Sequence, residues 1–156
     1  FFSKTKIEDI LHEIVESFRE SSSKKIKLNS DDDRNKFDFQ RSPELIYGLR
    51  NFIGNAVKFS KSTVEIDIKS NSQNLEVSIN DDGPGFPDDV KELLGEPYIN
   101  SKSQEVNINS GTGLGTFLGK TLLERKSARL SFLQDKKLGG ASVKILWNVK
   151  DLKSSL

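Results

Sequence analysis

Apolar residues recur along the chain with two different spacings, and these spacings separate the expected helices from the expected strands. Residues 5–20 and 43–59 place apolar side chains three and four positions apart, which lines one face of a helix. A third segment of this kind runs from 113 to about 126. Ser42 followed by Pro43 is typical of a helix start, because proline suits the first helical position. The pattern predicts three long helices.

Other segments alternate apolar and polar residues, which is typical of half-buried strands. The expected strands, in chain order, are residues 26–28, 37–39, 63–70, 74–81, 129–135 and 141–149. Short polar turns join strand 63–70 to strand 74–81 and strand 129–135 to strand 141–149. Each of these two pairs is therefore expected to form an antiparallel hairpin. Helices together with mostly antiparallel strands predict a two-layer α/β sandwich.

The first helix carries the single histidine of the chain, His12. Thr5 and Glu8 have the spacing of a capping box that would begin this helix. A zinc-protease helix needs a second histidine four positions after the first, and Glu16 stands there instead. His12 also lies off the apolar face, and we expect it to be a surface residue.

Residues 87–94 suggest a short helix, and the stretch 95–113 after it has little to bury. We expect this stretch to be a mobile loop, and long loops in compact domains are usually functional.

Composition narrows the classes of function. The 156 residues suit one domain, and 24 basic against 23 acidic residues produce no field that would attract nucleic acid or an anionic membrane. The absence of cysteine excludes disulfides, thiol nucleophiles and zinc–thiolate sites. No apolar run approaches the length of a membrane span. Because the chain opens with Phe1 and lacks methionine, we expect it to be a piece of a longer protein.

Three polar residues share one edge of the helix 43–59. Asn51, Asn55 and Lys58 lie three and four positions apart within "NFIGNAVKF". Amide oxygens suit Mg²⁺, and a lysine adds a point charge for phosphate. Taken alone, a solvated helix edge explains the same residues.

Glycines gather at the start of the third helix, in "GTGLG" at 111–115. Backbone N–H groups at a helix start form an anion site, although such a cluster can also be a simple tight turn. A P-loop is excluded because the Gly-Lys-Ser/Thr ending is absent. A dinucleotide fingerprint is not favoured, because a long loop precedes the glycines where a strand should be.

Two further segments have ordinary explanations when each is taken alone. The stretch "NDDGPGF" at 80–86 follows a strand and has the residue types of a turn, as do Gly139 and Gly140 between the last two strands. Lys102 lies in the expected mobile loop, where a flexible ammonium could close over a phosphate. A lysine on a surface loop is equally commonplace.

Taken together, these motifs occur in a fixed order, and in this the chain resembles the catalytic, ATP-binding domain of bacterial sensor histidine kinases. That family belongs to a wider group that includes the ATPase domains of gyrase and Hsp90. The segments "PELIYGLRNFIGNAVKFS" and "GKTLLERKSARLSF" are further similar to RegB-type kinases. The matching segments are "NFIGNAVKF" for the N box, "DDGPGF" for the G1 box, "EPYINSK" for the F box, "GTGLG" for the G2 box and "GGAS" for the final glycine box. The resemblance implies the Bergerat fold, a mixed, mostly antiparallel sheet covered on one face by three helices.

The resemblance also implies residue roles. Asn55 would bind Mg²⁺, while Asn51 and Lys58 would lie at the phosphate end of the pocket. Asp81 would accept a hydrogen bond from the adenine amino group, as a carboxylate can. Gly83 and Gly85 would let the chain pass beside the base without a Cβ clash. Asp82 is expected to be replaceable.

Residues 95–111 would form a lid over ATP, from which Lys102 would reach the γ-phosphate. The F box usually has a phenylalanine where this chain has Tyr98, a conservative change. The residues implied for the phosphates are Gly111, Thr112, Gly113, Leu114 and Gly115.

At position 51 the gyrase and Hsp90 branch has a glutamate that activates water, and an amide cannot act as a general base near neutral pH. The resemblance therefore favours transfer of the γ-phosphoryl group of ATP to a histidine over rapid hydrolysis. The alternatives are a hydrolytic ATPase of the gyrase type and a nucleotide-binding regulatory module without catalysis.

The implied partners are a dimerisation domain that carries the accepting histidine and, through the full-length kinase, a response regulator receiver domain. Neither nucleic acid nor direct membrane contact is expected. The expected location is cytoplasmic, and the sequence leaves open whether the parent protein is anchored in the inner membrane. Residues 1–4 would end the linker from the dimerisation domain, 5–150 would form the ATP-binding domain and 151–156 a tail.

Overall fold

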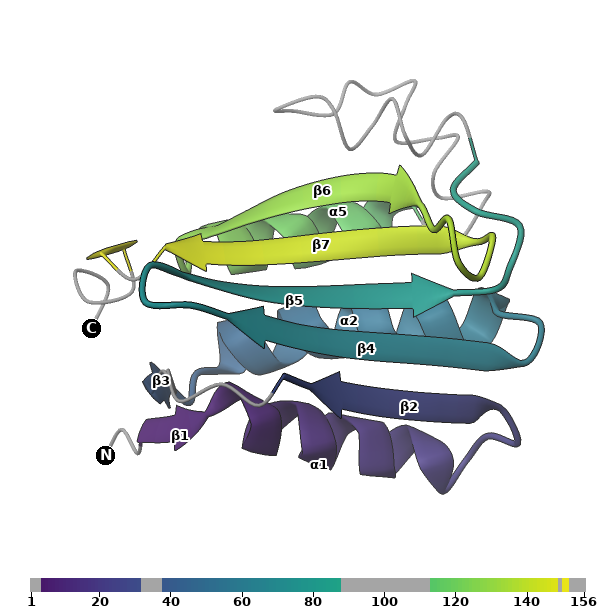
Figure 1. The fold of residues 1–156 in the computed structure, drawn as a ribbon, viewed down its shortest axis with the longest axis horizontal. Helices are drawn as coiled ribbons and strands as arrows, with labels where there is room; N and C mark the ends of the chain where they lie inside the picture. Colours follow the sequence, from purple (N-terminus) through teal and green to yellow (C-terminus); the bar gives the residue numbers. More distant parts are fainter. Residues whose placement is uncertain (1–3, 32–37, 88–112, 149, 152–156) are drawn as a thin grey trace.

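A five-stranded sheet forms one layer of the protein. The computed structural model describes residues 4–31, 38–87, 113–148 and 150–151. Neighbouring strands are antiparallel except for β2 and β4, which run parallel (Figure 1). In spatial order the strands are β2 (Lys25–Ser30), β4 (Thr63–Ser70), β5 (Asn74–Asp81), β7 (Ala141–Asn148) and β6 (Ala128–Gln134).

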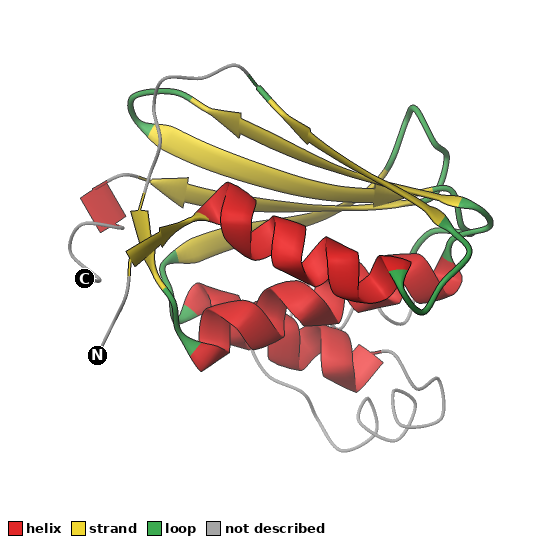
Figure 2. Ribbon diagram, turned by 90° about the horizontal axis from the view of Figure 1, so that it is seen from below, coloured by secondary structure: helices red, strands yellow, loops and turns green. Residues whose placement is uncertain are grey.

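Three helices among the described residues form the second layer. They are α1 (Ile7–Arg19), α2 (Pro43–Phe59) and α5 (Gly113–Glu124). All three lie on the same face of the sheet (Figure 2). The expected sandwich, covered on one face by three helices, is therefore confirmed. Both expected hairpins are also confirmed, since β4 pairs with β5 and β6 with β7 in antiparallel registers.

The helix starts agree with the sequence pattern in one case and disagree in another. The Ser42 hydroxyl accepts a hydrogen bond from the Leu45 N–H at 3.2 Å and caps α2, as the Ser-Pro pair predicts. The capping box expected at Thr5 is wrong. Thr5 lies in the short strand β1 (Lys4–Lys6), which pairs with β3 (Asp38–Gln40), and α1 begins after Lys6 with no side-chain cap.

The core lies between the helices and the sheet. Each strand directs alternate side chains toward the helices, where Val64, Ile79 and Ile145 are almost wholly buried. Phe39 packs edge-on against Trp147, with the ring centroids 5.0 Å apart. His12 is exposed on α1, as expected.

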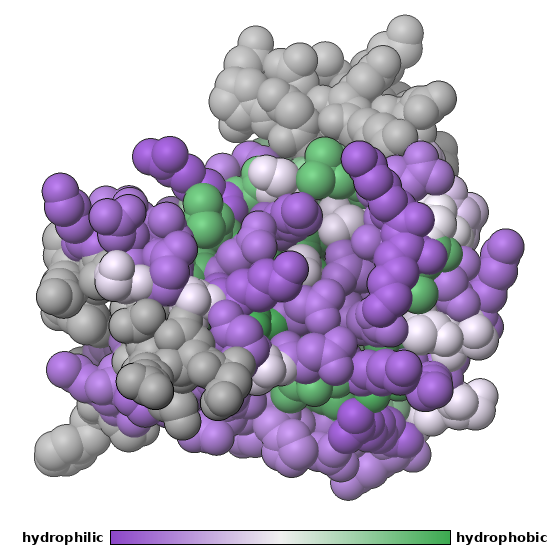
Figure 3. Space-filling view, in the orientation of Figure 1, coloured by the Kyte–Doolittle hydropathy of each residue, from purple (hydrophilic) through white to green (hydrophobic). Residues whose placement is uncertain are grey.

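No described helix covers the opposite face of the sheet, and the surface on this side is largely hydrophilic (Figure 3). Of the expected helix 87–94 and the expected loop 95–113, only Pro87 and Gly113 lie within the described residues. Within the described part of the chain, no helix combines the length and apolar character needed to cross a membrane.

Candidate functional site

A cavity of about 250 Å³ opens between α2, α5 and the ends of β5 and β7. Most of the side chains around it are apolar, and three polar side chains, from Asn55, Asp81 and Thr116, reach it. The described lining residues are Phe52, Asn55, Ala56, Phe59, Ile79, Asp81, Pro84, Gly85, Phe86, Pro87, Thr116, Ala141 and Val143. A flat apolar group with a few hydrogen-bonding atoms is the kind of ligand that such a cavity accepts.

Asp81 ends β5 and presents its carboxylate to this cavity. One oxygen, Oδ1, accepts hydrogen bonds from the backbone N–H groups of Gly83 at 2.8 Å and Ala141 at 3.1 Å. These two bonds fix the orientation of the carboxylate and leave Oδ2 as the acceptor for a ligand. The residue is only 5% exposed.

The surroundings of Asp81 also set its acidity. Burial raises the pKa of its carboxyl above the ordinary value, because the charged form loses hydration. The N–H groups of Gly83 and Ala141 oppose this shift, while the nearby charges of Asp82 and Asp135 add to it. A raised pKa at a carboxyl in a cavity is typical of functional sites.

Two glycines allow the chain to pack closely around Asp81. A Cβ atom on Gly83 would lie 2.3 Å from the carbonyl oxygen of Phe59. A Cβ atom on Gly140 would lie 2.3 Å from Asp81 Oδ1 and 2.4 Å from the Asp81 carbonyl oxygen. Gly140 is thus more than part of a turn, since its N–H also donates to the Asp81 carbonyl at 3.0 Å.

The backbone angle at Gly85 gives a reason for glycine that is separate from the expected clearance beside the base. Its φ is +88°, a conformation that L side chains rarely adopt, and a Cβ atom on it would have no described atom within 4 Å. The requirement comes from the backbone angle. Gly139 in the β6–β7 turn has a φ of +90°, and this backbone angle favours glycine there in the same way.

The two asparagines of α2 lie beside the start of α5. The Asn55 amide nitrogen donates to Thr116 Oγ1 at 3.0 Å and more weakly to Asn51 Oδ1 at 3.4 Å. Thr116, only 3% exposed, was not singled out by the sequence motifs, although it directly follows Gly115. A Cβ atom on Gly115 would lie 3.4 Å from Asn51 Nδ2, an ordinary contact, whereas one on Gly48 would lie 2.7 Å from the Leu123 side chain, so Gly48 is the glycine that lets α5 approach α2.

The donor set of Asn55 suits the magnesium ion that the resemblance implies. Because its amide nitrogen is directed to Asn51 and Thr116, the side chain offers a ligand its oxygen, the atom type that Mg²⁺ prefers. No group of three or more His, Asp or Glu side chains among the described residues could hold a metal ion.

Lys58 occupies the exposed end of α2. Its ammonium lies 5.1 Å from the centre of the Phe59 ring, and Lys58 is not among the described residues that line the cavity. Gly113 begins α5, as the glycine pattern predicts, and Leu114 follows it. The remaining expected site residues, Tyr98, Lys102, Gly111 and Thr112, lie outside the described residues.

The contacts of Asp82 contradict the expectation that it is replaceable. Its Oδ1 accepts hydrogen bonds from the N–H groups of Lys61 at 2.8 Å, Ser62 at 3.1 Å and Thr63 at 3.2 Å. Its Oδ2 accepts from the Ser62 hydroxyl at 2.9 Å. Burial opposes its ionisation, but these bonds outweigh it and lower the pKa of Asp82 to about 2. Asp82 therefore holds the turn between α2 and β4.

Comparisons with known proteins agree with this architecture. The model of the family described as "Histidine kinase-, DNA gyrase B-, and HSP90-like ATPase" matches residues 40–151. The sensor histidine kinase RegB of Cereibacter sphaeroides is 38% identical over 127 residues, which cover 72% of this chain and 28% of RegB. The chain thus spans less than a third of that relative.

Two solved structures share the fold. The nucleotide-free catalytic domain of the histidine kinase ThkA has a TM-score of 0.72 at 16% identity, covering 95% of this chain and 97% of that one. Full-length ShkA, solved in complex with AMPPNP, has a TM-score of 0.69 at 20% identity, covering 94% of this chain and 30% of ShkA.

The family match includes α2, the end of β5, α5 and the start of β7, all of which contribute residues to the lining of the cavity. It also agrees with the order of motifs in the sequence. This chain therefore belongs to the histidine kinase-, DNA gyrase B- and HSP90-like ATPase family, and it is a domain of the sensor histidine kinase type.

Proposed function

We propose that this domain binds ATP together with Mg²⁺ and provides the γ-phosphoryl group that is transferred to a histidine of a dimerisation domain in the same kinase. The observation that carries the proposal is the carboxylate of Asp81 in an otherwise largely apolar cavity. Its Oδ1 is engaged by two backbone N–H groups, and Oδ2 remains to accept a hydrogen bond. The AMPPNP bound to ShkA, which has the same fold, supports a nucleotide as the ligand.

The cavity suits adenine in both shape and polarity. Ile79 and Val143 line it with aliphatic groups, against which a base can pack. The adenine amino group would donate to Asp81 Oδ2. A guanine carbonyl at the same place would face the carboxylate with a second acceptor, which is unfavourable. The proposed selectivity for adenine rests on this difference.

At the other end of the ligand, the phosphates would extend toward α2 and the start of α5. Asn55 would hold Mg²⁺, with Asn51 close by, and the N–H groups at the start of α5 would bind phosphate oxygens. The magnesium ion, when bound, would neutralise part of the charge of the phosphates. Lys58 and Lys102 are proposed to add positive charge at the γ-phosphate.

In the proposed reaction an imidazole nitrogen of the acceptor histidine attacks the γ-phosphorus. The new P–N bond forms as the bond from the γ-phosphorus to the bridging oxygen breaks, and ADP leaves with that electron pair. Asn51 supports transfer over hydrolysis, because an amide cannot remove a proton from water near neutral pH. We further propose that the phosphoryl group then passes to the receiver domain of a response regulator.

The test supplies the 156-residue chain with ATP labelled at the γ-phosphate and a helical dimerisation domain that contains the acceptor histidine. The expected result is label on that domain that is stable to alkali and lost in acid, as a phosphorus–nitrogen bond requires. Tight ATP binding with no labelled histidine would refute the kinase proposal and leave a regulatory module. Fast release of inorganic phosphate without the acceptor would favour the hydrolytic ATPase.

A variant of Asn55 separates the magnesium site from the adenine site. Asn55→Ala is expected to weaken binding of ATP in the presence of Mg²⁺ and to leave binding of adenosine, which has no phosphates, nearly unchanged. Normal dependence of ATP affinity on Mg²⁺ in this variant would refute the assignment of Asn55.

A further inference from the structure

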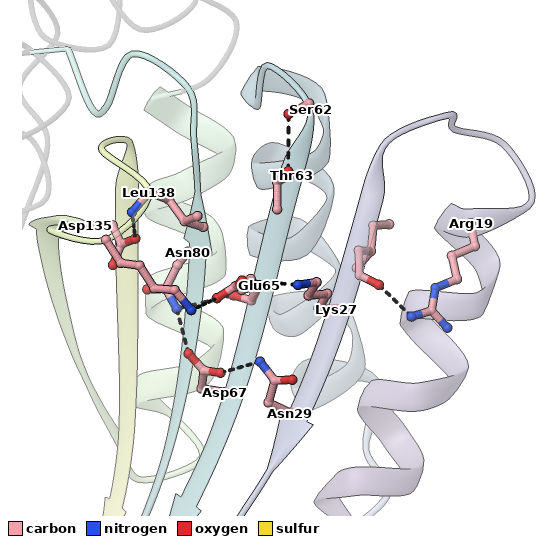
Figure 4. Close-up of polar contacts among 12 residues, drawn as sticks. Arg19, Lys27, Asn29, Ser62, Thr63, Glu65, Asp67, Asn80, Asp135 and Leu138 are labelled. Atoms are coloured by element: carbon pink, nitrogen blue, oxygen red, sulfur yellow. Dashed lines mark hydrogen bonds and ion pairs between the residues drawn. The ribbon is translucent and has the colours of Figure 1, made fainter.

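A chain of side-chain hydrogen bonds crosses the helix-free face of the sheet. We call it the cross-sheet chain, and it consists of Asn29 on β2, Asp67 on β4, Asn80 on β5 and Ser142 on β7. Asn29 Nδ2 donates to Asp67 Oδ1 at 2.9 Å, and Asn80 Nδ2 donates to Asp67 Oδ2 at 3.2 Å (Figure 4). The Ser142 hydroxyl donates to Asn80 Oδ1 at 2.6 Å. Side chains from four strands are thereby linked.

Burial increases along this chain toward β7. Asn29 is exposed and Asp67 is half-buried, whereas Asn80 is 7% exposed and Ser142 is 3% exposed. The Asn80 amide also donates to the backbone carbonyl of Glu65 at 3.2 Å. Because a buried amide without partners is costly, these bonds hold Asn80 in one orientation.

The buried end of the cross-sheet chain lies directly behind the cavity. Asn80 precedes Asp81 on β5, and Ser142 follows Ala141 on β7. Because side chains alternate along a strand, Asn80 and Ser142 point to one face of the sheet, and Asp81 and Ala141 to the other. Asn80 and Ser142 are also the last residues of the β5–β7 register at this end. Beyond them, the N–H groups of Gly140 and Ala141 must reach Asp81.

We propose that Asn80 and Ser142 are positioning residues for recognition of the adenine amino group. Their hydrogen bond fixes the separation of β5 and β7 at the point where Ala141 holds Asp81 Oδ1. This in turn fixes where Asp81 Oδ2 lies in the cavity. The inference rests on the proposed binding of ATP, and it adds two residues that do not contact the ligand.

A purely structural role for this pair makes a different prediction. If the bond only stabilised the fold, its loss would lower the stability of the protein, and all nucleotides would bind equally well to the folded fraction. If the bond positions Asp81, its loss weakens the interaction with the amino group and spares the rest of the ligand. The affinity ratio between ATP and an analogue without the amino group therefore separates the two roles.

The experiment compares the 156-residue chain with Ser142→Ala, using ATP and purine riboside triphosphate, which lacks only the 6-amino group. Dissociation constants are measured by calorimetry with Mg²⁺ present. The variant is expected to bind ATP about three- to tenfold more weakly, the range for loosening one hydrogen bond, and to bind the analogue within about twofold of the parent chain. Ser131→Ala, an exposed serine on the same face of β6, is the matched control and should change neither constant.

Asn80→Ala breaks the same hydrogen bond from the other strand and provides the comparison if Ser142→Ala does not fold. The fluorescence of Trp147, the single tryptophan, reports the folding of each variant. An unchanged affinity ratio in folded variants, or equal weakening for both nucleotides, would overturn the inference. If the parent chain itself bound neither nucleotide, the proposed function would fail; if it bound both equally, the role of Asp81 would fail instead.

Discussion

Replacing Asp81 by asparagine is expected to remove the acceptor for the adenine amino group while keeping the fold. Two backbone N–H groups, from Gly83 and Ala141, point at the position of Oδ1. In Asp81→Asn the amide oxygen must take that position, because an NH₂ group there would face two donors. The NH₂ group then takes the position of Oδ2, where it meets the amino group of adenine, donor against donor.

The magnitude follows from this geometry. A hydrogen bond to a charged group contributes about 1.5–3 kcal/mol. Its loss corresponds to an ATP affinity lower by about 10- to 150-fold, since each 1.4 kcal/mol is tenfold. Stability should not fall, because the raised pKa of Asp81 shows that the folded state disfavours the charged carboxylate that asparagine replaces.

The assay is calorimetric titration of the variant with ATP and with ITP, whose base has a carbonyl in place of the amino group. The new NH₂ group can donate to that carbonyl, so the variant should bind ITP more tightly than the parent chain does. The ratio of ATP affinity to ITP affinity should therefore fall by more than the ATP affinity itself. Asp9→Asn, at an exposed aspartate of α1, is the matched control and should bind as the parent chain does. A folded Asp81→Asn variant that binds ATP within twofold of the parent chain would refute the reasoning.

Three other substitutions test the framework around the cavity. Gly140→Ala places a Cβ 2.3 Å from Asp81 Oδ1, so we expect a loss of stability of about 1–3 kcal/mol in denaturant unfolding and ATP binding more than about tenfold weaker. Normal ATP affinity would show that the β6–β7 turn does not set the position of Asp81. The carboxylate of Asp82 has a pKa of about 2 in the folded state against an ordinary 3.8, so it stabilises the fold above pH 3.8, and this contribution is lost as the pH falls toward 2. Asp82→Asn should remove this pH-dependent contribution, which is on the order of 1 kcal/mol after solvent screening. Identical acid unfolding curves for the variant and the parent chain would contradict this prediction. Ser42→Ala removes the cap of α2 and should lower the free energy of unfolding by about 1 kcal/mol with ATP affinity kept, which thermal unfolding and titration would check.

The sequence by itself determined the local elements and part of the site. The helices, the two hairpins and the cap at Ser42 follow from patterns in which the interacting residues are close in the sequence, and there the prediction was accurate. The motif at Asp81 and the glycine at 113 were found in the same way, because each depends on a few neighbouring residues. The expected cap at Thr5 failed because pairing of β1 with β3, more than thirty residues away, competes with the local signal.

Only the tertiary structure decided which residues support the site. Thr116 contacts Asn55 across 61 positions, Gly140 packs on Asp81 from another strand, and Asp82 holds the turn at Ser62. Such contacts join segments that have no shared period, so no spacing in the sequence reveals them. The parallel pairing of β2 with β4 has the same origin, since it depends on where α2 returns the chain to the sheet. Periodicity reports which face of an element is buried, and packing determines what that face meets.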